Sequence, residues 1–274
     1  MKSFAEKRVF ITGGSSGIGH ATATLLAKAG AHVAIGARDR RRLEVALGQL
    51  QGVGEPGVQK LAAVSVDVSD VASVRAAREQ VLAELGGLDI LINNAGVARP
   101  GYVDDLDDEV FTHTMQVNYF GVVNTTRAFL PDLRAQGGGH IVNVSSLLGF
   151  MGVFGYTAYA ASKFAVVGFS ECLRQELLKD QIGVSILYPP DTDTPQLAEE
   201  NRFKPAETKA VAGNVKVMSP ERVAQCLLAG ISANRLHIVP GAGSRFTHFM
   251  YRHFPWMVRR VIDGDVRKTA RSLD

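Results

Sequence analysis

The chain has 274 residues, of which 46% are hydrophobic and 21% charged, a composition typical of a globular protein with enough apolar content for a sizeable core. The formal charge of +3 is too small to indicate nucleic acid as a partner, and no run of about 18 apolar residues predicts a membrane span. Two cysteines, no histidine or cysteine cluster and no signal-peptide pattern predict a reducing, cytoplasmic location without a metal site.

Short apolar runs alternate with helical stretches along the chain. The runs are typical of strands buried on both faces of a parallel sheet, and they lie at Val9–Thr12, Ala31–Ile35, Leu61–Val66, Asp89–Ile92, His140–Val144, Gly183–Leu187 and Leu236–Val239. Helices are expected near 18–29, 39–50, 70–86, 107–135, 156–179 and 219–232. This order predicts one doubly wound α/β domain of the Rossmann type over residues 1–243, with a seven-stranded parallel sheet. A polar insert at 189–218, expected to be the substrate loop, and a C-terminal extension at 244–274 fall outside it.

A glycine-rich segment, Thr12–Gly19, follows the first strand and opens the first helix. Glycines let the backbone approach a pyrophosphate, and a helix N-terminus supplies unpaired N–H donors. A purely structural turn is the alternative, but this context favours a dinucleotide site. The expected contacts are Gly13, Ser15, Ser16, Gly17, Ile18 and Gly19.

The end of the second strand bears on whether the dinucleotide carries a 2′-phosphate. A carboxylate at this point would hydrogen-bond the adenosine ribose and repel that phosphate. Ala37 stands where the acid would be expected, and Arg38 follows it with a guanidinium suited to phosphate. Arg38, with Ser15 as a second contact, therefore predicts NADPH. The alternatives are that Asp39 meets the ribose or that Arg38 only begins a solvated helix.

Polar residues also follow the third and fourth strands. Asp67 is expected to accept a hydrogen bond from the adenine amino group, although it could simply begin a turn. Asn94, Ala95 and Gly96 close the fourth strand, where small residues let the backbone pass close to a ribose.

Tyr159 and Lys163 stand four residues apart in a segment expected to be helical, and Ser146 lies 13 residues upstream of the tyrosine. Residues at this spacing share a helix face. A nearby cation should lower the pKa of the phenol from about 10 toward neutral pH. Such a phenol gives a proton to a carbonyl oxygen while hydride arrives at the carbon.

These motifs, in this order, resemble the short-chain dehydrogenase/reductase family over about residues 5–240. The resemblance implies that Tyr159 is the general acid and that Lys163 lowers its pKa and holds the nicotinamide ribose. It also implies that Ser146 positions the substrate carbonyl, and that Asn118 stabilises a bent helix and a water relay to Lys163.

The resemblance also bears on neighbouring residues and on assembly. The spacing selects Ser146 over the adjacent Ser145. Tyr156 is not expected to be the general acid, because no lysine stands four residues after it at position 160. It is expected instead to pack beside the pocket or to line it. Homodimers or homotetramers are the family expectation, with helices 107–135 and 156–179 as the contact surface.

The insert departs from the family pattern at one position, and its sequence resembles one group within the family. Pro189 is followed by Pro190 in place of the usual glycine, so any backbone donation from that position is lost. Pro189 and Thr194 are still expected to contact the nicotinamide end of the cofactor. Residues 188–208, together with 154–159, are similar to the 3-ketodihydrosphingosine reductases. This similarity implies NADPH-dependent reduction of a long-chain sphingoid-base ketone in sphingolipid biosynthesis.

Two other functions remain open at this stage. A hydroxysteroid-type or broad carbonyl reductase would use the same machinery, and a non-catalytic nucleotide-binding redox sensor would have lost it. The sphingoid substrate carries an amine near its ketone, so one acidic side chain of the insert is a candidate partner for the ammonium. Solvation is the alternative for each of these side chains, which are Asp191, Asp193, Glu199 and Glu200.

The C-terminal extension combines basic residues with an apolar stripe. Residues 245–274 hold seven Lys or Arg and three Asp or Glu, and Pro255 is expected to kink or split a helix. The segment predicts either peripheral contact with an anionic membrane surface or a helix that docks on its own domain or on a second subunit. The stripe consists of Phe246, Phe249, Met250, His253, Phe254, Met257, Val258 and Val261.

Overall fold

The computed structural model describes residues 3–55, 57–213 and 217–273. Within them, seven parallel strands form one sheet in the order β3-β2-β1-β4-β5-β6-β7. Each strand lies within two residues of its predicted position, so the predicted doubly wound sheet is confirmed. The strands are β1 (Arg8–Thr12), β2 (His32–Ala37), β3 (Leu61–Ser65), β4 (Ile90–Asn93), β5 (Gly139–Val144), β6 (Ile182–Leu187) and β7 (His237–Ile238).

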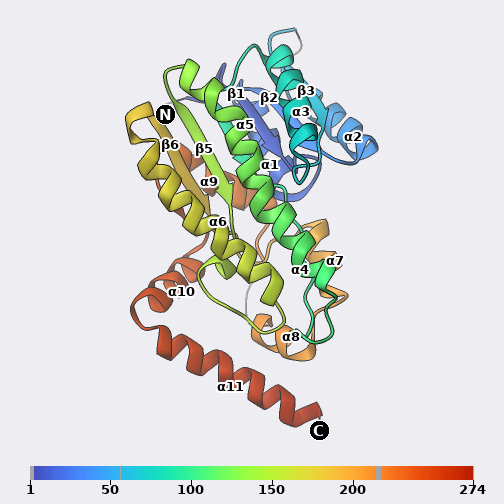
Figure 1. The fold of residues 1–274 in the computed structure, drawn as a ribbon, viewed down its shortest axis with the longest axis vertical. Coiled ribbons are helices and arrows are strands. Elements are labelled where there is room, and N and C mark those ends of the chain that lie inside the picture. Colours follow the sequence, from blue (N-terminus) through green and yellow to red (C-terminus); the bar gives the residue numbers. More distant parts are fainter. Residues whose placement is uncertain (1–2, 56, 214–216, 274) are drawn as a thin grey trace.

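Helices cover both faces of this sheet (Figure 1). The first three are α1 (Gly17–Lys28), α2 (Arg40–Gln51) and α3 (Val71–Leu85). The helix expected at 107–135 is divided into α4 (Asp108–Met115), a π-helical turn η1 (Gln116–Phe120) and α5 (Gly121–Ala135). The helix expected at 156–179 is α6 (Thr157–Glu176) followed by the 3₁₀ turn η3 (Leu178–Asp180), and α9 (Pro220–Ser232) matches the last expected helix.

The alternating side chains of each strand feed two separate apolar layers. Val9 and Ile11 of β1 pack on one side with α1, α2 and α9. Phe10 packs on the other side with α3, α5 and α6, where its ring lies 5.1 Å from that of Phe129. Because both faces are covered, the strands read as continuous apolar runs, which is why they are recognisable in the sequence.

The insert is partly helical and follows β6. It contains α7 (Pro195–Asn201) and α8 (Ala206–Ala212), while residues 214–216 of the expected substrate loop lie outside the described part of the chain. A short 3₁₀ turn, η2 (Leu147–Gly149), follows β5 and lies near α6.

The C-terminal extension forms two helices, α10 (Ala242–His253) and α11 (Pro255–Leu273), so the predicted split at Pro255 is confirmed. On α10, His248 packs against the rings of Phe150 and Tyr188, at centroid distances of 4.7 and 5.8 Å. Helix α11 lies along the lower end of the molecule, against α8 (Figure 1). Among the described residues, no helix has both the length and the apolar character needed to span a bilayer.

Candidate active site

A cavity of about 860 Å³ lies at the carboxyl ends of the central strands. The strand order reverses at β1, which pairs with β2 on one side and β4 on the other, and parallel sheets open a crevice at such a point. Most of the predicted site residues line this cavity; they are Gly13, Ser15, Ser16, Gly17, Ile18, Arg38, Asn94, Ala95, Gly96, Ser146, Tyr159, Lys163, Pro189 and Thr194. The predicted residues outside its lining are Gly19, Asp67 and Asn118.

The glycine turn is tight and is held from the fourth strand. Gly13 has φ +66°, and a Cβ there would come within 2.8 Å of the Asn94 amide nitrogen. That amide nitrogen donates to the carbonyls of Thr12 and Gly13, each at 3.0 Å. Ser16 precedes α1 without making a side-chain cap, so the first N–H groups of the helix have no side-chain acceptor there. These features suit a turn that receives a phosphate.

Arg38 and Asp39, the two charged residues expected near a 2′-phosphate or a ribose, are placed differently. Arg38 is exposed at the edge of the cavity. Asp39 caps α2 by accepting a hydrogen bond from the Arg42 N–H at 3.1 Å, which gives its carboxylate a local structural role.

Asp67 closes the turn that follows β3. Its Oδ1 accepts hydrogen bonds from the N–H and the hydroxyl of Ser69, at 2.9 and 2.6 Å. Burial alone would raise the pKa of Asp67, but these hydrogen bonds and the charge of Arg38 lower it. The geometry matches the turn interpretation, and the contact with adenine stays a prediction.

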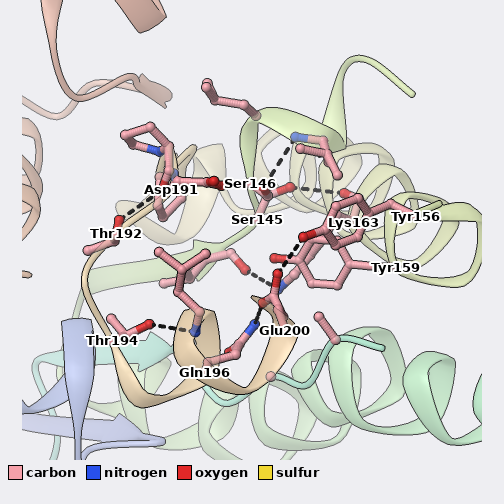
Figure 2. Close-up of a pocket in the computed structure, with 18 of the residues that line it drawn as sticks. Ser145, Ser146, Tyr156, Tyr159, Lys163, Asp191, Thr192, Thr194, Gln196 and Glu200 are labelled. Atoms are coloured by element: carbon pink, nitrogen blue, oxygen red, sulfur yellow. Dashed lines mark hydrogen bonds between the residues drawn. The ribbon is translucent and has the colours of Figure 1, made fainter. Parts of the chain in front are cut away.

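Tyr159 and Lys163 lie one helical turn apart on α6 (Figure 2). The Lys163 Nζ lies 5.5 Å from the centroid of the Tyr159 ring and donates to the Val144 carbonyl at 2.9 Å. The Ser145 hydroxyl donates to the Lys163 carbonyl at 3.0 Å, so it fastens α6 to the end of β5. Ser146 lies beside Tyr159 and forms a hydrogen bond that lowers the pKa of the phenol.

The expected net decrease in the Tyr159 pKa is wrong for this structure. Burial raises the pKa above its ordinary value, and the carboxylate of Glu200 raises it further, while only the hydrogen bond with Ser146 acts in the opposite direction. Burial also lowers the pKa of Lys163 to about 8. The desolvation of both groups, together with the nearby carboxylate, therefore outweighs the effect that a lysine alone would have.

Asn118 lies in the π-helical turn η1, fully buried behind the cavity. Its amide accepts from the Val97 N–H at 2.8 Å and donates to the Val97 carbonyl and the Ser162 hydroxyl, each at 2.9 Å. A π turn is a common way to bend a helix at a functional site. The side chain thus ties this bend to the loop after β4, and the water relay to Lys163 stays a prediction.

The start of the insert meets the glycine turn. The Pro189 carbonyl accepts from the Leu147 N–H at 3.2 Å. Thr194 caps α7 by accepting from the Leu197 N–H at 3.2 Å, and its methyl group lies so close to Gly17 that a Cβ there would approach within 2.9 Å. The glycine turn and the start of the insert, which are the two parts of the predicted cofactor site, are therefore adjacent. The contact of Thr194 with the carboxamide stays a prediction.

A buried carboxylate, Glu200 of α7, also faces this cavity and is only 8% exposed. Its two oxygens accept hydrogen bonds from the Tyr156 hydroxyl at 2.7 Å and from the Gln196 amide at 2.9 Å (Figure 2). The solvated alternative therefore fails for Glu200, although it holds for the exposed Asp193 and Glu199. The sequence offered four acidic residues and no signal that distinguished this one.

Sequence reasoning also missed an ion pair in the cavity and part of its apolar wall. The buried Lys204 lies 3.5 Å from Asp191, and both line the cavity. Further apolar lining comes from α8 and α11, through Val211, Val258, Val261 and Ile262. Nothing in the local sequence indicates that these segments meet.

Known proteins resemble this chain in sequence and in fold. The profile of the short chain dehydrogenase family matches residues 7–205. The chain is 40% identical to a 3-dehydrosphinganine reductase of Danio rerio over 221 residues, which cover 80% of this chain and 67% of that protein. It is 39% identical to a 3-ketodihydrosphingosine reductase of Bos taurus over 218 residues, with 79% and 66% covered, so it spans about two thirds of the length of these relatives.

A solved structure shares the fold as well. The short chain dehydrogenase/reductase of Burkholderia phymatum in complex with NAD superposes with a TM-score of 0.78 at 28% identity, covering 87% of this chain and 90% of that one. The chain belongs to the short-chain dehydrogenase/reductase family and is an oxidoreductase that acts on ketone and alcohol groups.

Proposed function

We propose that the protein uses NADPH to reduce the ketone of a long-chain sphingoid base, 3-ketodihydrosphingosine, to the secondary alcohol. The observation that carries the proposal is the placement of Ser146, Tyr159 and Lys163 in the same cavity as the glycine turn. Relatives at about 40% identity are named for this reaction.

The site residues fit a bound nicotinamide dinucleotide, which supplies the hydride. Gly13 and the uncapped start of α1 suit the pyrophosphate, and the Lys163 ammonium, which lines the same cavity, would donate to ribose hydroxyls. With a pKa of about 8, Lys163 is mostly charged at neutral pH.

Tyr159 supplies the proton to the ketone oxygen, and Ser146 positions that oxygen. The pKa of Tyr159 lies above its ordinary value, so the phenol carries its proton at neutral pH and can donate it. Ser146 donates a hydrogen bond to the same carbonyl oxygen and fixes its position. The carbon gains hydride and the oxygen gains the phenol proton, which together yield the alcohol.

NADPH is favoured over NADH by three neighbouring residues. Ala37 ends β2 without a carboxylate, Arg38 is exposed at the edge of the cavity, and Asp39 is engaged as the cap of α2. A guanidinium pairs readily with a 2′-phosphate, and the charge that would repel this phosphate is absent at the end of β2.

The far wall of the cavity suits an alkyl chain. Leu148 and Met151 line it near η2, and Val258 and Ile262 line it from α11. Burial of methylene groups is worth about 0.8 kcal/mol each, so a long chain gains considerable affinity along such a wall.

A panel of substrates tests the proposal. Long-chain 3-keto-sphingoid bases, steroids and short ketones are compared by kcat/KM, each with NADPH and NADH. The proposal expects the highest value for the sphingoid base with NADPH, and a steroid preference would contradict it. In the same assay Tyr159→Phe should lower kcat by about 100-fold or more, since it removes the proton donor; near-normal turnover would refute the assigned role.

We also propose that the C-terminal extension contacts an anionic membrane surface. Phe246, Phe249 and Trp256 are 65%, 52% and 64% exposed, and arginines such as Arg259 and Arg260 are exposed on the same two helices. Basic residues beside exposed aromatic rings are typical of interfacial helices. Because α11 also lines the cavity, this contact would place the cavity near its lipid substrate.

A further inference from the structure

Glu200 is a carboxylate at a site of reaction without a cationic partner of its own. It lines the cavity, is 8% exposed, and receives hydrogen bonds from two neutral donors, Tyr156 and Gln196. In the described part of the chain, no Lys, Arg or His nitrogen lies within 4.0 Å of its oxygens.

The other charged groups near Glu200 are already engaged. Lys204 pairs with Asp191 at 3.5 Å, and Lys163, whose Nζ donates to the Val144 carbonyl at 2.9 Å, acts on Glu200 only through space, without an ion-pair contact. Burying a carboxylate without a counter-ion costs free energy that hydrogen bonds from neutral donors offset only in part. A cationic group on the ligand would supply the missing charge.

The position of Glu200 relative to the proton donor narrows the choice of ligand. Tyr156 directly precedes α6 and Tyr159 lies in its first turn, with ring centroids 5.7 Å apart, and the hydroxyl of Tyr156 donates directly to Glu200. Figure 2 shows Glu200 of α7 pointing toward these two rings. A cation at Glu200 therefore lies close to the carbon that is reduced.

We infer that Glu200, held by Tyr156 and Gln196, binds the ammonium group of an amino ketone whose amine is on the carbon next to the ketone. The inference rests on the proposed function, and it assigns one residue to the recognition of the amine. This contact would distinguish a sphingoid base from steroids and plain ketones, which have no positive charge next to the ketone.

The same contact has a consequence for the chemistry. The charge of Glu200 is one cause of the raised pKa of Tyr159. A bound ammonium offsets this charge, which lowers the pKa of the phenol and makes it a stronger acid when the amino ketone is present. An uncharged ketone would not have this effect.

The test compares two ketones of equal chain length, one with the amine and one without it. For the wild-type protein, kcat/KM should be about 100-fold higher for the amino ketone, the size expected for a hydrogen-bonded charge pair in a buried site. Glu200→Gln should remove most of this preference by lowering kcat/KM for the amino ketone, whereas kcat/KM for the plain ketone should not fall, because loss of the Glu200 charge makes Tyr159 a stronger acid.

Glu207→Gln is the matched control. Glu207 is also a buried carboxylate of the insert that accepts from a tyrosine, Tyr102, at 2.9 Å, but it does not line the cavity. This variant should keep the wild-type preference. Asp191→Asn should also keep it, and loss of the preference in that variant alone would assign the amine to Asp191 and overturn the inference.

The outcomes distinguish the inference from the proposed function. If the wild-type protein reduces the sphingoid base but Glu200→Gln lowers both ketones equally, Glu200 is not the amine site and the proposed function stands. If the wild-type protein reduces only uncharged ketones, both fail. Should Glu200→Gln fold poorly, the wild-type comparison still decides, because equal kcat/KM values for the two ketones would refute recognition of the amine.

Discussion

Replacing Lys163 by Met should stabilise the fold at neutral pH while it removes activity. Lys163 is 3% exposed, and burial lowers its pKa from 10.5 to about 8. At about 1.4 kcal/mol per pKa unit, holding this lysine charged in the folded state costs about 3 kcal/mol. The substitution also removes the hydrogen bond to the Val144 carbonyl, worth about 1 kcal/mol, so a net gain of about 2 kcal/mol is expected.

The gain should depend on pH in a defined direction. Below pH 8 the lysine is protonated in both the folded and the unfolded state, and the wild-type protein bears the full cost of burial. Between pH 8 and 10.5 the unfolded chain keeps a proton that the folded protein has lost, so the stability of the wild type rises with pH. The advantage of Lys163→Met should therefore shrink through this range to about zero at pH 10, and it should reverse to about −1 kcal/mol only above pH 10.5.

Urea denaturation followed by circular dichroism measures both free energies of unfolding, at pH 7 and at pH 10, with equal protein concentrations. Lys204→Met is the control, because Lys204 is equally buried but has Asp191 as its partner. Lys204→Met leaves Asp191, whose side chain is 32% exposed, without its counter-ion, so this variant should be destabilised at pH 7. A Lys163→Met protein that is less stable than the wild type at pH 7 would refute the reasoning.

Three further predictions concern the cofactor, the membrane and the assembly. Arg38→Ala should raise KM for NADPH by about 10- to 100-fold and leave KM for NADH nearly unchanged, and an equal rise for both would contradict a 2′-phosphate contact. Trp256, the single tryptophan, is 64% exposed, so its fluorescence should shift to shorter wavelength with phosphatidylglycerol vesicles, but not with phosphatidylcholine vesicles or after Arg259→Glu with Arg260→Glu; an unchanged spectrum would count against membrane contact. Phe164 of α6 is 44% exposed, so Phe164→Glu should convert a dimer or tetramer to monomers in light scattering, and a wild-type protein that is already monomeric would argue against a subunit contact on α6.

The sheet and the glycine turn were predictable because their signals are local. Strands buried on both faces must be apolar throughout, and the turn after β1 needs glycine where φ is positive, as at Gly13 and Gly17. The spacing of Tyr159 and Lys163 works in the same way, since one helical turn is enough to bring them together. The sequence order of parallel strands then collects these local features at one edge of the sheet.

The features that were missed depend on contacts between distant segments. Glu200 and Tyr156 are 44 positions apart, and only the fold of the insert brings them within 2.7 Å. The direction of the Tyr159 pKa was wrong for the same reason, because a lysine four residues away is visible in the sequence while burial and Glu200 are not. The π turn at η1 also escaped prediction, since helical periodicity continues on both sides of it.

The fold buries charges of opposite sign in this cavity. Their contacts with the ligand explain why a buried charge that costs free energy is retained. Lys163 on α6 and Glu200 on α7 both lie close to Tyr159, and the charge of Lys163 costs free energy to bury. An apolar substitution at Lys163 would favour folding at neutral pH, but it would remove a charge that the ligand meets. An amino ketone placed with its carbonyl at Tyr159 and Ser146 and its ammonium at Glu200 has one orientation that satisfies both ends. In the proposed complex the contact at Glu200 therefore does more than bind, since together with Tyr159 and Ser146 it fixes the orientation of the ketone.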